Sequence, residues 1–114
     1  AVLVERDRRA AEVIRANARA LGLGDEQVAL RQLPAAAAVR TARERGEAYD
    51  LVFLDPPYRQ APALGAELAV ALAPLLAVGA RVVTESDHRL PLDLPLPISH
   101  ERRYGDTLIR IHTA

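Results

Sequence analysis

The sequence predicts an α/β fold in which a mostly parallel sheet carries helices on both faces and ends in an antiparallel hairpin. Strand-like and helix-like segments alternate three times along the 114 residues, as in parallel strands joined by helical crossovers. The last two strand-like segments are separated by Gly105-Asp106, a turn that suits an antiparallel pair. The length suits one domain. Because the chain opens directly on an apolar strand, we expect residues 1–114 to be a single domain truncated at its amino-terminal side.

The first half of the chain contains three predicted strands and two predicted helices. Asp7 is positioned to cap the first helix, and Gly22 and Gly46 are positioned to end the first and second. Residues 49–54 are nearly all apolar, which is typical of a parallel strand that is covered on both faces. The predicted strands are 1–5, 28–31 and 49–54, and the predicted helices are 8–21 and 34–45.

The second half begins with leucines at helical spacing over residues 62–76, although Pro74 lies near the end of this predicted helix. Gly79 then leads into a fourth strand over residues 80–85. Proline and leucine dominate the segment that follows, which predicts an extended loop. The predicted loop is 86–97, and the two hairpin strands are 98–103 and 107–112.

Composition restricts the chemistry and the location of the protein. Half of the residues are hydrophobic and only 4% are aromatic, so the core must be built from Ala, Val, Leu and Ile. Because Cys is absent, the chain has no disulfide and no zinc site of the common Cys type. The apolar runs are too short for a membrane span. We therefore expect a cytoplasmic protein with no metal and no membrane contact.

The formal net charge is zero, and all fifteen basic residues are Arg. This balance does not by itself indicate a nucleic-acid-binding protein. Any contact with nucleic acid must therefore come from a local patch of this chain or from a part of the protein outside it.

The most informative motif is Asp55–Tyr58, which reads Asp-Pro-Pro-Tyr directly after the predicted strand 49–54. Ligands of open α/β sheets bind at the carboxyl ends of the strands, where Glu5 and Glu85 also lie. Proline has no backbone N–H. Pro56 and Pro57 therefore leave a stiff loop that presents acceptors, namely a carboxylate and carbonyl groups.

Such a loop suits the activation of an exocyclic amine on a nucleic-acid base, which is a poor nucleophile because its lone pair is delocalised into the ring. Hydrogen bonds from its two N–H groups to Asp55 and to the Pro56 carbonyl would favour a tetrahedral nitrogen that faces a methyl sulfonium. Tyr58 offers a flat face on which an extruded base can stack. The alternative is an ordinary turn, but the position after a buried strand favours the catalytic interpretation.

Further candidates carry weaker signals. Glu5 ends the first strand, where an acid can accept hydrogen bonds from a ribose diol or simply be solvated. Gln32 and Leu33 follow the second strand and are equally compatible with an adenine-side loop and an ordinary one. Three arginines are compatible with phosphate contacts, although a solvated surface is the favoured interpretation of each alone: Arg59, Arg102 and Arg103. The three histidines have no ligand spacing, and we assign them no function.

Taken together, these motifs resemble the RsmD-type methyltransferases, which methylate the N2 amine of a guanine in 16S ribosomal RNA. The resemblance covers essentially the whole chain. Asp-Pro-Pro-Tyr is shared with enzymes that methylate amino groups of DNA, whereas the terminal Tyr-Gly-Asp-Thr points to the RsmD type. The matching segments are Val4–Asp7, Asn17, Leu21–Leu23, Leu54–Tyr58, Val83–Glu85 and Arg103–Thr107.

The resemblance implies a class I methyltransferase fold, a Rossmann-like three-layer αβα sandwich, with S-adenosylmethionine as the methyl donor. By position, Glu5 and Arg6 match the part of the family that holds the cofactor ribose, and Gln32 and Leu33 match the adenine-side loop. The residues that match the catalytic loop are Asp55, Pro56, Pro57 and Tyr58. Asp55 also faces the cofactor in this match. The positions that match substrate-binding residues are Tyr58 and Arg59.

The family also has an amino-terminal segment with a basic RNA-contacting region, a first strand and a Gly-rich cofactor loop, which do not occur in these 114 residues. In the usual strand order the absent strand lies between 1–5 and 49–54. We therefore expect exposed strand edges and doubt that this chain is active alone.

The implied function is methyl transfer to a guanine N2 amine. The implied partner is 16S ribosomal RNA or a small-subunit particle, and the protein is expected to be a monomer. Two alternatives remain open. One is a DNA amino-methyltransferase acting on adenine N6 or cytosine N4. The other is a non-catalytic nucleotide-binding fragment, for example of the NAD type, against which Asp55–Tyr58 argues because a dehydrogenase does not need that loop.

Overall fold

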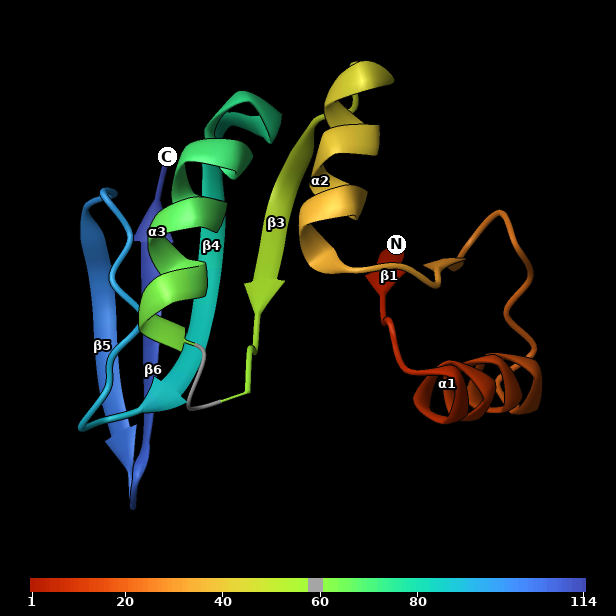
Figure 1. Ribbon diagram of the computed structural model, residues 1–114, viewed down its shortest axis with the longest axis horizontal. Coiled ribbons are helices and arrows are strands. Elements are labelled where there is room, and N and C mark those ends of the chain that lie inside the picture. Colours follow the sequence, from red (N-terminus) through yellow and green to blue (C-terminus); the bar gives the residue numbers. More distant parts are fainter. Residues whose placement is uncertain (58–60) are drawn as a thin grey trace. The chain divides into compact units, whose positions relative to one another are not determined.

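A computed structural model describes residues 1–57 and 61–114, with the backbone alone for residues 61–64, 66 and 69. The chain divides into two compact units, Ala1–Thr41 and Ala42–Ala114, and each is described by itself. Figure 1 shows the elements of each unit along the chain. That both units belong to one domain stays a prediction.

The first unit is built around a parallel pair of short strands, β1 (Val2–Val4) and β2 (Ala29–Arg31). The helix α1 (Arg8–Ala20) connects them. It begins as predicted, because the Asp7 side chain accepts a hydrogen bond from the Ala10 backbone N–H at 2.8 Å. A further helix, α2 (Ala35–Glu44), starts in this unit and ends in the second.

The second unit contains a four-stranded sheet in the order β3-β4-β6-β5, with β3 and β4 parallel and the other pairs antiparallel. In the described part of the connection from β3 to β4, a helix is followed by a 3-10 turn, and the β5–β6 pair is the predicted hairpin (Figure 1). The elements are β3 (Tyr49–Leu54), α3 (Ala61–Leu72), η2 (Ala73–Leu75), β4 (Leu76–Asp87), β5 (Ile98–Tyr104) and β6 (Thr107–Thr113).

The core of the second unit lies on one face of this sheet. Every second residue of β4 from Ala80 to Ser86 is buried, which is the alternation expected of a strand with one covered face. Buried leucines come from the helical segment, from β6 and from the loop after β4: Leu68, Leu72, Leu75, Leu92 and Leu108. Ala, Leu and Val make up the apolar core of the described residues, in agreement with the composition.

The opposite face of the same sheet is open. Leu51 is 52% exposed and Phe53 is 71% exposed, so the prediction that residues 49–54 are covered on both faces is wrong for the described structure. No described element of this unit buries these two side chains. The two edge strands also differ, since β3 is apolar whereas all residues of β5 are exposed and three consecutive ones are charged, Glu101–Arg103.

The structure corrects the boundary between the fourth strand and the helix before it. The predicted helix over 62–76 ends at Leu72, because Pro74 lacks an N–H and the chain continues as a 3-10 turn. Strand β4 already begins at Leu76, which pairs with Tyr49, and it ends at Asp87. Gly79 lies within it at a positive φ of 77°, where β4 advances by more residues than β3 and the register shifts. The sequence had marked this glycine as the residue before a strand.

Candidate functional site

The Asp55 loop leaves the sheet at the carboxyl end of β3. Leu54 is in register with Thr84 of β4, and Asp55 follows directly. Asp55 and Pro57 are exposed, whereas Pro56 is buried. A residue before proline is restricted to extended backbone, so Asp55 continues the direction of β3. The structure therefore places an exposed carboxylate and a buried proline at the expected edge of the sheet.

The other two residues predicted for this loop, Tyr58 and Arg59, lie outside the described residues. Their roles in stacking and in substrate binding stay predictions.

In the first unit, two of the residues predicted for the cofactor, Glu5 and Gln32, lie at the carboxyl edge of the parallel pair. Val4 is in register with Arg31, and the Glu5 backbone N–H donates to the Arg31 carbonyl at 3.1 Å. Glu5 and Gln32 are thus neighbours at the ends of β1 and β2. The Glu5 carboxylate accepts a hydrogen bond from the Asp7 N–H at 2.7 Å, which fixes it at the start of α1.

Gln32 is exposed and Leu33 is partly exposed beside it. The Arg15 guanidinium of α1 donates to the Gln32 side-chain oxygen at 3.0 Å and so orients this amide. Arg6 is exposed. The edge therefore offers a carboxylate, a side-chain amide and an apolar side chain, which are the group types that suit a ribose diol and the edge and face of adenine.

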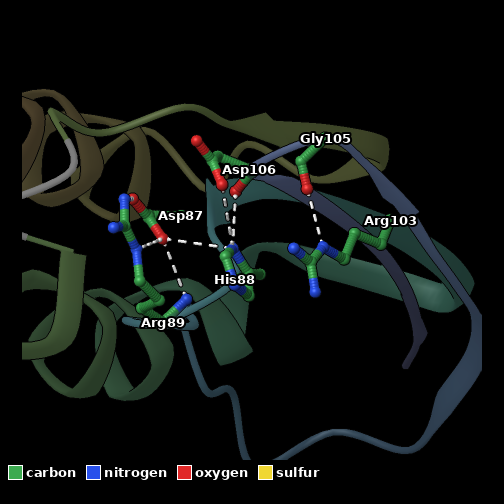
Figure 2. Close-up of polar contacts among 6 residues, drawn as sticks. All are labelled: Asp87, His88, Arg89, Arg103, Gly105 and Asp106. Carbon is green, nitrogen blue, oxygen red and sulfur yellow. Dashed lines mark hydrogen bonds and ion pairs between the residues drawn. The ribbon is translucent and has the colours of Figure 1, made fainter.

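A cluster that the sequence did not predict ties the end of β4 to the β5–β6 turn (Figure 2). The His88 backbone N–H donates to the Asp106 carbonyl at 2.9 Å. The His88 Nδ1 lies 3.5 Å from Asp87 Oδ1 and 3.7 Å from Asp106 Oδ1. On the other side, the Asp87 carboxylate accepts hydrogen bonds from the Arg89 guanidinium at 2.7 and 3.0 Å. This His88 cluster fixes the hairpin at the same edge as the Asp55 loop.

The sequence missed this cluster because His88 has no ligand spacing to another histidine. The contact arises from the pairing of β4 with β6, in which Asp87 lies opposite Thr107 and Asp106 therefore reaches His88. That pairing joins residues far apart in the sequence and leaves no local signal.

The cluster predicts a pH dependence of stability. Hydrogen bonds from the Arg89 side chain and backbone hold the pKa of the Asp87 carboxyl well below its usual range. A depressed pKa contributes stability at pH values above the ordinary Asp pKa of about 3.9, and this contribution is lost progressively as the pH falls from that value toward the lowered pKa of the folded state. We expect urea unfolding midpoints of the intact protein to fall between about pH 5 and pH 2, and to fall less in Asp87→Asn.

The matched control is Asp50→Asn, which removes an exposed carboxylate of β3. It should leave the acid dependence as in the wild type. An Asp87→Asn variant with the same acid dependence as Asp50→Asn would contradict the stabilising role of the Asp87–Arg89 pair.

The hairpin itself carries two of the arginines considered for phosphate contacts. The Arg102 guanidinium lies over the Tyr104 ring at 5.1 Å from its centroid, a cation–π contact. Arg103 Nε donates to the Gly105 carbonyl at 2.6 Å (Figure 2). Both arginines are exposed and each already has a partner within the hairpin.

Three further observations concern metal binding, membrane spans and surface hollows. Within residues 1–57 and 61–114, no three His, Asp or Glu side chains are grouped so that they would hold a metal ion. Of the helices described, none combines the length and the apolar character needed to cross a membrane. A shallow hollow of about 310 Å³ lies in the first unit beside α1 and β2, but none of the predicted site residues lines it.

Comparisons with solved structures support the predicted fold class. A hypothetical protein of Thermus thermophilus is 30% identical, with a TM-score of 0.82 over 99% of this chain and 61% of its own. A proposed methyltransferase of Escherichia coli, YhhF, is 23% identical, with a TM-score of 0.79 over 98% of this chain and 60% of its own. The predicted Rossmann-like α/β fold is thereby confirmed.

A more distant structure, SMU.776, is a proposed methyltransferase complexed with S-adenosylhomocysteine (SAH). It is 10% identical, with a TM-score of 0.80 over 99% of this chain and 38% of its own. This chain therefore spans about three fifths of the Thermus and Escherichia proteins and a smaller share of SMU.776.

Among curated proteins, none matches the chain significantly. A family model does match, over residues 1–113, and its description is conserved hypothetical protein 95. The match covers nearly the whole chain and agrees with the resemblance to the RsmD-type proteins. The chain belongs to the conserved hypothetical protein 95 family.

Proposed function

We propose that the intact protein transfers a methyl group from S-adenosylmethionine to the exocyclic N2 amine of a guanine in 16S ribosomal RNA. The observation that carries this proposal is the exposed Asp55 carboxylate in an extended, proline-stiffened loop at the carboxyl edge of a parallel strand pair. An acceptor held in this way suits an amine that must be oriented before it can react.

In this mechanism the loop acts on the amine. Asp55 accepts one N–H of the base and the Pro56 carbonyl accepts the other, which directs the nitrogen lone pair out of the ring plane. Bound S-adenosylmethionine supplies an electrophilic methyl group on its sulfonium. The N–C bond forms as the C–S bond breaks, the electrons of the C–S bond remain on sulfur as a neutral thioether, and the amine releases one proton to water by way of the Asp55 carboxylate.

The proposed cofactor residues are Glu5, Arg6, Gln32 and Leu33. Their chemistry fits the group, since the Glu5 carboxylate can accept from a ribose diol and Gln32 can bond the adenine edge while Leu33 packs on its face. The short distance between the ends of β1 and β2 supports a shared role for Glu5 and Gln32. Arg15 further limits the orientations of the Gln32 amide.

The choice of RNA rests on the resemblance to the RsmD type, and the terminal segment Tyr104–Thr107 carries it within this chain. Asp55–Tyr58 alone is equally compatible with amino groups of DNA. The proposed partner is therefore small-subunit RNA, free or assembled in a particle.

The test measures the transfer of labelled methyl groups by the intact protein. The substrates are small-subunit RNA, small-subunit particles and duplex DNA, and the methylated base is identified after digestion. Calorimetric titrations with S-adenosylmethionine and with NAD are run in parallel. We expect label in N2-methylguanine from RNA or particles, and binding of S-adenosylmethionine but not of NAD.

The other outcomes of these assays distinguish the two alternative functions. Label in adenine or cytosine of DNA would replace the RNA assignment with a DNA amino-methyltransferase. Binding of NAD without methyl transfer would replace the enzyme with a nucleotide-binding module.

A further inference from the structure

The second carboxylate at this edge is Glu85 of β4. Thr84 is in register with Leu54, the last residue of β3. We therefore expect Glu85 and Asp55, which follow them along the chain, to lie side by side. Adjacent strands lie about 4.8 Å apart, and the residue before a proline stays extended. The Asp55 loop and Glu85 are therefore within reach of one small planar ligand.

Glu85 belongs to the open face of the sheet. Its neighbours Thr84 and Ser86 are each 1% exposed and fill the core, whereas Glu85 is partly exposed on the opposite face. Its partner across β6 is Ile109, which is apolar. A carboxylate at the border of an apolar surface gains most from a donor that comes with the ligand.

The Glu85 carboxylate has no hydrogen bond and no ion pair to any residue that the structure describes, although its backbone belongs to the β4–β6 ladder. Asp87 lies on the same face two residues later, and three donor groups of Arg89 neutralise it. Of these two acids of β4, only Glu85 has both carboxylate oxygens available to accept hydrogen bonds from a ligand.

Guanine has a donor that this arrangement can recognise. Its N1–H lies directly beside the N2 amine, so a base whose amine is held by Asp55 presents a second N–H to a neighbouring acceptor. Adenine and cytosine instead carry a ring nitrogen with a lone pair beside the exocyclic amine. An ionised carboxylate only accepts hydrogen bonds, so it attracts the guanine edge and repels the other two.

We propose that Glu85 is a specificity-determining residue that accepts the N1–H of the target guanine. This inference rests on the proposed function and adds the group that selects the base. Asp55 and the Pro56 carbonyl orient the amine, and Glu85 distinguishes guanine from bases whose ring nitrogen accepts.

The experiment compares guanine with 2-aminopurine at the methylated position of a synthetic small-subunit RNA fragment. 2-Aminopurine keeps the exocyclic amine but has an acceptor in place of N1–H. We expect the wild-type intact protein to prefer guanine in kcat/KM. In Glu85→Gln, the side-chain amide can donate a hydrogen bond to N1 of 2-aminopurine. The ratio of kcat/KM for guanine to kcat/KM for 2-aminopurine should therefore fall by about 10-fold or more, which is the size of discrimination that one base contact provides.

Two further variants make the result specific. Glu85→Asp keeps the carboxylate on a shorter side chain and should keep the preference for guanine even where kcat/KM falls for both bases. Asp87→Asn removes a carboxylate from the same face of β4 and should leave the ratio between the two bases unchanged. Binding of S-adenosylmethionine to each variant verifies that it is folded.

The failures can be told apart. A wild-type protein that methylates neither base in the RNA fragment, and that also fails to methylate small-subunit RNA and particles, overturns the proposed function. A wild-type protein that prefers guanine, together with Glu85→Gln and Glu85→Asp variants that both keep the wild-type ratio, overturns the role of Glu85 alone. Loss of the preference in Glu85→Asp as well as in Glu85→Gln would show that the carboxylate does not read the base, and it also overturns this inference.

Discussion

Replacing Asp55 by alanine should lower kcat for methyl transfer by about 100-fold or more, the size of effect seen when one preorganised polar contact to a reacting group is removed. The reason is that the amine then keeps only the Pro56 carbonyl as an acceptor, and its lone pair stays in conjugation with the ring. The affinity for S-adenosylmethionine should change little, because the proposed contacts with its ribose and adenine come from Glu5, Arg6, Gln32 and Leu33 and not from Asp55. Single-turnover rates with labelled cofactor and calorimetric cofactor titrations measure the two quantities.

The matched control for this variant is Asp50→Ala, which removes an exposed carboxylate from the other end of β3. It should keep the wild-type rate. Asp55→Asn retains one acceptor oxygen and should fall between the wild type and Asp55→Ala. Wild-type turnover in Asp55→Ala would mean that the loop does not activate the amine.

Replacing Leu92 by alanine should lower the free energy of unfolding by about 2–5 kcal/mol, the usual range for truncating a fully buried leucine. Leu92 is 0% exposed, although it lies in the loop between β4 and β5. It packs at Gly65 of α3, where a Cβ atom would stand 3.1 Å from Leu92 Cγ. Urea unfolding measures the loss, and truncation of the 46% exposed Leu90 in the same loop should cost far less.

A double-mutant cycle tests the contact itself. Alanine is a better helix former than glycine by about 1 kcal/mol, but at Gly65 this gain is opposed by the Leu92 side chain. Gly65→Ala should therefore be more favourable in the Leu92→Ala background than in the wild type. Independent, additive effects would show that α3 and the loop do not meet there.

The strands and the hairpin could be predicted because their signals are local. Residues 49–54 are apolar apart from Asp50 and are followed by the Asp55 loop, and β3 spans that range. The Gly105-Asp106 turn separates two strand patterns, and β5 and β6 flank it. The α/β fold class follows from this order alone, and the position of the Asp55 loop follows from the fold class.

The remaining features depend on register, which one sequence does not reveal. Strand β4 begins early because Leu76 pairs with Tyr49 on the amino-terminal side of the register shift at Gly79. The contact between His88 and Asp106 joins residues eighteen positions apart, and Glu85 becomes a neighbour of Asp55 only through the pairing of β3 with β4. Burial is equally non-local, since Leu51 and Phe53 have the composition of a covered strand and are exposed.

The contrast between the two outer strands of the four-stranded sheet has a consequence for handling the protein. Three consecutive charged side chains of β5, Glu101–Arg103, disfavour pairing of that edge with a strand of another molecule. At the β3 edge the only charge within the strand is Asp50, and the four residues after it are apolar, so that edge is less protected. Self-association of isolated chains should therefore proceed through β3. The single substitution Leu51→Lys should reduce it and improve solubility.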